Sequence, residues 1–124
     1  MKRMFLLAGL LLFFSASAMA TNHEIKPVMP NLSGIGIGKK LYDRHCASCH
    51  GVSMKGTNQG PPFLHRIYHP SHHANGAFHM AVQRGVRRHH WKFGNMPAIK
   101  RVRRGMVSSI IKYVRFMQKQ AGIF

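Results

Sequence analysis

The chain has 124 residues, which is enough for one domain but too short for a second, and a domain of this size has a thin apolar core. Its 19 Lys and Arg residues stand against 2 Asp and Glu, which gives a formal net charge of +17. This balance indicates a partner with an acidic protein surface, anionic lipid or nucleic acid. The alternative is a solvated basic surface with no single docking site.

The first twenty residues have the pattern of a cleavable signal peptide. Lys2 and Arg3 form a basic start, an apolar run follows over residues 4–14, and small residues precede a cleavage site after Ala20. The alternative of an uncleaved anchor is disfavoured because the run is shorter than the ~20 residues that span a membrane comfortably. Cleavage predicts a periplasmic chain that keeps 17 of the 19 basic residues against two acids, a formal charge of +15.

Residues 21–35 are predicted to be an extended lead-in, because Pro27, Pro30 and Asn31 interrupt it and no hydrophobic period is present. The remaining residues, 36–124, are expected to form the single folded domain.

A helix is predicted from about Ile37 through a C-x-x-C-H motif. Tyr42, Cys46 and Cys49 are spaced at i, i+4 and i+7, so they share one helical face. Gly51 follows the motif and is a natural terminator.

The middle of the chain alternates loops with one short helix. Residues 52–62 and 86–100 are rich in Gly, Pro and Asn and are predicted to be loops, and residues 65–73 are irregular. A helix is predicted from about Asn75 to Arg84, where apolar residues recur at i, i+3, i+4 and i+7.

The last helix has the clearest period. Its apolar residues fall at i, i+3, i+4, i+7 and i+10: Val107, Ile110, Ile111, Val114 and Met117. Gly122 is predicted to end it. No strand-like alternation of useful length is present, so the sequence predicts a mostly α domain with a helix at each end and long loops between.

The motif Cys46-Ala47-Ser48-Cys49-His50 predicts attachment of one covalent haem. Each thiol would bond to a haem vinyl group, and His50 would ligate the iron from the proximal side. One alternative is a thiol–disulfide redox pair, but that motif usually lies in a βαβ domain, whose pattern is absent. The other is a zinc site, which normally needs a second cysteine pair, and the chain has 2 Cys in all.

Met96 is the predicted distal ligand of the iron. It lies in a Gly-Asn-Met-Pro loop, where Pro97 fixes the backbone beyond it. Thioether ligation favours Fe(II) and raises the reduction potential. The alternatives are a core-filling role for Met96, a five-coordinate iron, or a distal histidine that would lower the potential, with three candidates: His79, His89 and His90.

A further group of histidines lies in the irregular segment: His65, His69, His72 and His73. They could bind copper or another metal. The sequence favours the simpler interpretation of surface histidines in a basic segment.

These features together resemble the class I cytochrome c family over nearly the whole chain after the leader. The resembling stretches are Gly38–Tyr42 in the first helix, the C-x-x-C-H motif with Gly51, Gly60-Pro61-Pro62-Phe63-Leu64 for the family's G-P-x-L, Val82–Gly85, Asn95–Ala98, and Tyr113. The resemblance implies an all-α cytochrome c fold in which N- and C-terminal helices pack together and long loops wrap the haem.

The resemblance also implies roles for particular residues. Pro62 and Leu64 align with G-P-x-L, and the carbonyl of that proline is expected to accept a hydrogen bond from Nδ1–H of His50 and orient its ring. The implied activity is one-electron exchange between Fe(III) and Fe(II), so the protein is expected to be an electron carrier, monomeric when free, rather than an enzyme.

Basic residues bracket the predicted methionine loop: Arg84, Arg87, Arg88, Lys92, Lys100, Arg101, Arg103 and Arg104. They are expected to steer an acidic redox partner to the haem edge. The alternative function is a haem-bearing relay subunit of a larger membrane or periplasmic oxidoreductase. Binding to nucleic acid or anionic lipid ranks third, because it gives the C-x-x-C-H motif no purpose.

Overall fold

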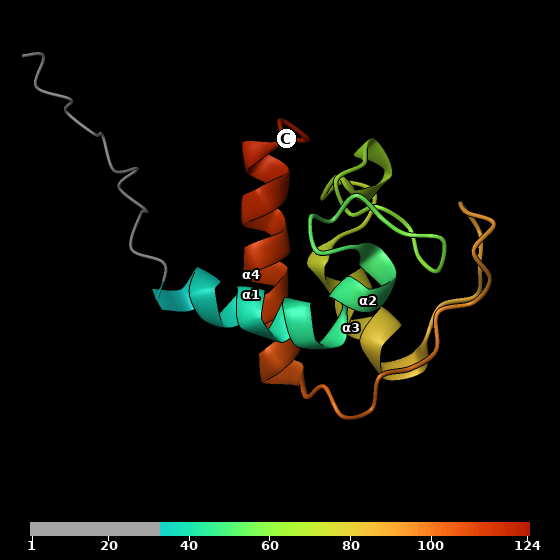
Figure 1. Cartoon of the computed structure of the whole chain (residues 1–124), viewed down its shortest axis with the longest axis horizontal. Coiled ribbons are helices and arrows are strands. Elements are labelled where there is room, and N and C mark those ends of the chain that lie inside the picture. The colour runs from blue at the N-terminus through green and yellow to red at the C-terminus, as the bar shows by residue number, and fades with distance from the viewer. Residues whose placement is uncertain (1–32) are drawn as a thin grey trace, which may run out of the picture.

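A computed structural model describes residues 33–124, which form four α-helices and one short 3₁₀ helix joined by long loops (Figure 1). The elements are α1 (Ser33–His45), α2 (Ala47–His50), the 3₁₀ helix η1 (Arg66–Tyr68), α3 (Asn75–Arg84) and α4 (Arg104–Gln120). Within the described range, β-structure is limited to one isolated bridge between Val86 and Met96. The predicted all-α domain is therefore confirmed, and α3 has the bounds that the period predicted.

Helix α1 begins earlier than the sequence predicted. The predicted lead-in ended at residue 35 and the helix was expected from about Ile37, but residues 33–35 are already helical. The reason is tertiary: Gly34 and Gly36 weaken the local helix signal, whereas Ile35 packs against the buried core and stabilises the first turn. The predicted signal peptide and the rest of the lead-in lie outside the described residues.

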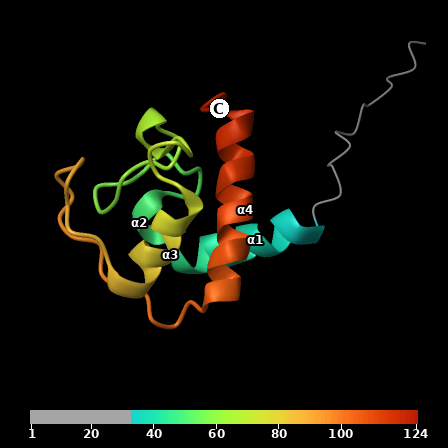
Figure 2. The same cartoon turned by 180° about the vertical axis from the view of Figure 1, so that it is seen from behind.

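The frame of the fold is the crossing of α1 and α4, which both views show (Figures 1 and 2). The two backbones meet at Gly38, where a Cβ atom would lie 2.2 Å from the Ser109 carbonyl oxygen and 2.8 Å from Cβ of Tyr113. Any side chain at this position would push the helices apart, because the nearest atom is backbone and cannot rotate away. This contact explains why position 38 of α1 is a glycine.

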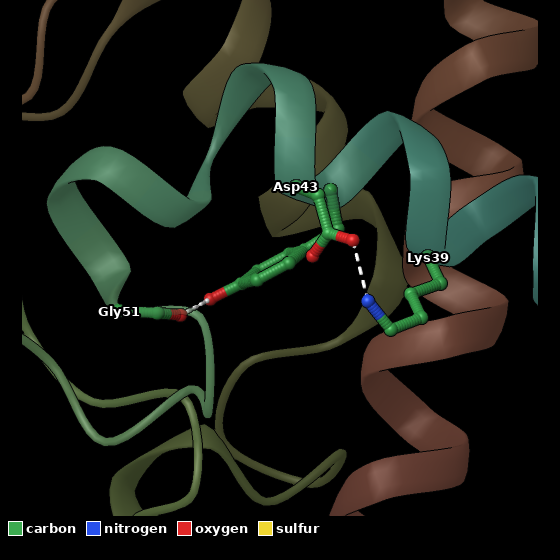
Figure 3. Close-up of polar contacts among 4 residues, drawn as sticks. Lys39, Asp43 and Gly51 are labelled. Carbon is green, nitrogen blue, oxygen red and sulfur yellow. Dashed lines mark hydrogen bonds and ion pairs between the residues drawn. The ribbon is translucent and has the colours of Figure 1, made fainter.

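The core lies along the inner face of α4 and the end of α1. Val107, Ile110, Ile111 and Val114 are buried as their period predicted. Tyr42 is fully buried, and its hydroxyl donates to the Gly51 carbonyl at 2.7 Å, which ties α1 to the residue after α2 (Figure 3). The ion pair of Lys39 and Asp43 in the same figure lies on the exposed side of α1, where solvent screens it.

Arg115 on α4 holds the irregular segment before α3 in place. Its guanidinium donates to the carbonyl oxygens of Tyr68 and His73, to Oδ1 of Asn75 at 2.9 Å and to Oε1 of Gln118 at 2.7 Å. The buried Gln118 in turn donates to a loop carbonyl at 2.9 Å. A segment with little regular structure is thus fixed by charge-assisted bonds to the most regular helix.

No helix among the described residues combines the length and the apolar character needed to cross a membrane.

Candidate cofactor site

A cavity of about 620 Å³ opens between α2, α3 and the loops that flank them. This volume lies within the roughly 300–1,000 Å³ typical of cofactor pockets. Its walls are mainly apolar, with side chains such as Phe63, Phe78, Val82, Val107 and Ile110 contributing to the lining. The structure therefore contains a large apolar cavity in a domain whose own core is thin.

Both cysteines of the C-x-x-C-H motif line this cavity, and no disulfide joins them. Cys46 lies at the junction of α1 and α2, and Cys49 lies one turn later within α2. Burial, with a smaller effect of Cys49, raises the pKa of the Cys46 thiol to about 11. A thiol–disulfide redox pair needs a stabilised thiolate, so the raised pKa disfavours that interpretation.

His50 is buried at the cavity wall beside the two thiols, with 7% of its surface exposed. Its Nδ1 lies 2.9 Å from the Pro61 carbonyl oxygen. Since a carbonyl can only accept, Nδ1 carries the proton and Nε2 is left free to bind a metal. Burial lowers the pKa of His50, against the raising effect of the Pro61 bond, which favours the neutral imidazole that metal ligation requires.

The hydrogen-bond acceptor for His50 is Pro61, and the prediction of Pro62 was wrong by one residue. Gly60 sets the register, because a Cβ there would lie 2.8 Å from the Cys49 carbonyl oxygen, so the loop passes directly against α2. Counted from Gly60, the first proline supplies the carbonyl and Phe63 takes the apolar position. The Phe63 ring stacks on the His50 imidazole with 4.1 Å between centroids.

The loop after α2 folds back under the motif and satisfies its carbonyl groups. Thr57 Oγ1 donates to the Cys49 carbonyl at 2.6 Å, and the Gly56 N–H donates to the His50 carbonyl at 2.9 Å. Gly51 starts this reversal with a φ of +80°, in the left-handed region that favours glycine. One side-chain bond and one backbone bond from this loop thus hold the motif in place.

Met96 lies in the cavity lining, on the loop that returns from α3. Its backbone N–H and carbonyl both pair with Val86 at 2.9 Å, which closes residues 86–96 into a hairpin-like loop. At the base of this loop, a Cβ on Gly85 would lie 2.5 Å from the Met96 carbonyl oxygen. Met96 is half-buried at the cavity wall.

The three histidines that are alternatives to Met96 as the distal ligand differ in their position relative to the cavity. His89 and His90 also line the cavity, whereas His79 does not, and its buried Nδ1 has no hydrogen-bond partner among residues 33–124. A further thioether that sequence reasoning missed, that of Met80 on α3, also lines the cavity, and Met80 is 48% exposed. Its only sequence signal is that it falls outside the apolar period of α3.

The donor set fits a covalently attached haem. Two thiols and a neutral imidazole share one wall of an apolar cavity, and a thioether of Met96 is available in the same lining. Zinc is a poor match, because neither cysteine has a second thiol pair to complete a tetrahedral site.

A sequence model described as Cytochrome c matches residues 35–118, which spans α1 to the last turn of α4. No curated protein and no solved structure shows significant similarity to the chain.

Proposed function

Because the chain belongs to the cytochrome c family, we propose that it is a free, exported carrier of single electrons that docks on an acidic redox partner. The family and the single C-x-x-C-H motif imply one covalent haem c per chain, and members of the family are typically electron carriers rather than enzymes. When bound, the haem supplies one-electron exchange at its iron.

The observation that carries this function is His50, buried beside both thiols and oriented by Pro61. Cys46 and Cys49 hold the cofactor covalently, so it is retained after export. The Pro61 carbonyl fixes the His50 ring and increases its basicity. Phe63 and the other apolar residues of the lining exclude water from the metal, which the reduction potential of such a site depends on.

Met96 is the proposed distal ligand. Support comes from its place in the cavity lining and from the Val86 bridge and the close approach of Gly85, which together fix the backbone that carries it. Export is supported by the leader pattern of residues 1–20, which lie outside the described part of the chain.

The docking proposal rests on the charges at the cavity mouth. Arg87 and Arg88 are exposed and belong to the cavity lining, and Lys92 is exposed on the same loop. Among residues 33–124, Asp43 is the one carboxylate side chain, and it is paired with Lys39. A partner that approaches the cofactor therefore meets positive charge, and an acidic surface is favoured.

We expect the second-order rate of electron transfer to an acidic redox protein to fall roughly 10-fold or more between about 0.01 M and 1 M salt, where the Debye length shrinks from about 30 Å to about 3 Å. Stopped-flow absorbance of the haem measures this rate. The variant Arg87→Gln/Arg88→Gln should lose part of the low-salt rate and flatten the salt dependence.

The matched control is Lys112→Gln/Lys119→Gln, which removes two exposed charges of α4 that are outside the cavity lining. A rate independent of salt would contradict steering. Equal losses in both double variants would contradict docking at the cavity mouth.

A further inference from the structure

Three histidines from two separate loops meet beside the cavity. His72 and His73 lie before α3 and His90 lies after it, and one ring nitrogen from each lies within 4.8 Å of the others. Nε2 of His72 and Nε2 of His90 are 3.2 Å apart although 18 residues separate them in the chain. The loop after α3 therefore lies beside the loop before it.

The spacing of these nitrogens suits a tetrahedral metal. With metal–nitrogen bonds of about 2.0–2.1 Å, two imidazole nitrogens on one tetrahedral ion are about 3.4 Å apart. The His72–His90 pair is already close to that separation. The third nitrogen has at most about 1.4 Å to close, which rotation of the exposed side chains of His72 and His90 can supply.

The third ligand, His73, has the outer support expected of a metal-binding histidine. Its Nδ1 lies 2.6 Å from the Ile67 carbonyl oxygen, so Nδ1 carries the proton and Nε2 is its free ligand atom. The His73 carbonyl and that of Tyr68 accept from Arg115, which fixes this turn on α4. The ring is therefore oriented before any metal arrives.

A fourth imidazole, that of His89, lies near the cluster. The His89 ring centroid lies 4.3 Å from that of His90 and 6.0 Å from that of His73. Its Nδ1 lies 2.8 Å from the Arg87 carbonyl oxygen, which again leaves Nε2 free. His89 is outside the cluster whose nitrogens lie within 4.8 Å of one another, so water is expected in the fourth position.

The chemistry of the ligands selects the ion. Imidazoles suit borderline metals such as Zn²⁺ and Cu²⁺, whereas Mg²⁺ and Ca²⁺ prefer carboxylate and carbonyl oxygens, and no carboxylate is in the cluster. Arg87, Arg88 and Lys92 on the same loop oppose any cation by charge repulsion. Binding must therefore come from coordination rather than from electrostatic attraction.

We propose that His72, His73 and His90 form a binding site for Zn²⁺ or Cu²⁺ that joins the loop before α3 to the loop after it. His73 and His90 also line the cavity, so the ion lies at its rim and restrains the loop that carries Met96. The site is separate from the haem motif and does not depend on the proposed electron-carrier role.

The test is calorimetric titration of the haem-loaded protein with ZnCl₂ in chelator-treated buffer. We expect one saturable Zn²⁺ per chain. Binding should be at least about 10-fold weaker in each of the single variants His72→Gln and His90→Gln, because losing a ligand costs no less than losing the group that orients it. Saturating Zn²⁺ should raise the thermal midpoint of the wild-type protein and not that of His72→Gln. Cu²⁺ bound at the same site should show imidazole nitrogen hyperfine structure in its electron paramagnetic resonance spectrum.

The matched control is His69→Gln, which removes a neighbouring histidine that is outside the cluster. Its Zn²⁺ affinity should equal that of the wild type. Three results would overturn the site: binding that does not saturate at one ion, an equal loss in His69→Gln, or a changed visible spectrum of oxidised His90→Gln without Zn²⁺, which would make His90 an iron ligand instead. Retained circular dichroism shows that each variant is folded.

Discussion

Replacing both Cys46 and Cys49 with alanine is expected to yield a chain that carries no covalent haem and is largely unfolded. The thioether bonds are the only covalent links that the sequence offers the cofactor, since the chain has 2 Cys. Without the haem, a cavity of about 620 Å³ with apolar walls would be left in a small domain. Such a void removes much of the burial that stabilises a chain of this length.

Visible absorption and far-ultraviolet circular dichroism of the purified chain measure both effects. The matched control is Ser48→Ala, which changes an exposed residue between the two cysteines and leaves both thiols. That variant should keep its colour and its helicity. A double alanine variant that remained red and helical after a denaturing wash would contradict covalent attachment through these residues.

Replacing Met96 with alanine is expected to abolish the weak absorption band near the red end of the visible spectrum that is typical of Met–Fe(III). The reduction potential should fall on the order of 0.1 V, part of the ~0.8 V range that axial ligands span, because the thioether favours Fe(II). The change should be spectroscopic more than structural, since the loop is held by backbone bonds between Val86 and Met96.

The matched control is Met80→Ala, because Met80 is the other thioether among the lining residues named above. It should keep the band and the potential. If the band survives in Met96→Ala and disappears in Met80→Ala, the distal ligand comes from α3. If the wild-type protein has no such band and His90→Gln alters its spectrum, a histidine is the ligand.

Periodicity in the sequence was enough to predict the helices that frame the site. The bounds of α3 and the buried face of α4 agree with the prediction, because apolar spacing reports directly on which face is buried. The start of α1 could not be predicted this way. Its glycines lower helix propensity, and the stabilising contacts come from α4, which is distant in the sequence.

In the site, too, local features could be predicted from the sequence and contacts between distant segments could not. The C-x-x-C-H motif is local, so Cys46, Cys49 and His50 could be placed on one wall from their spacing alone. The acceptor of the His50 hydrogen bond could not, because two adjacent prolines leave the register open and only the contact of Gly60 with α2 decides it.

Contacts between distant loops were beyond the sequence altogether. The sequence favours surface histidines over a metal site in residues 65–73, and nothing in their spacing indicates that His90 lies beside His72. Arg115 has no special signature on α4, yet it fixes the turn that positions His73. Both facts depend on the three-dimensional path of the chain around α3.

The central claim is tested most directly by the intact mass of the wild-type protein. The protein is purified from cells that attach haem to exported proteins, and its mass is measured after denaturation. The account predicts a polypeptide heavier by one haem, with the added mass retained under conditions that remove every noncovalent ligand. A mass equal to that of the bare polypeptide would contradict it.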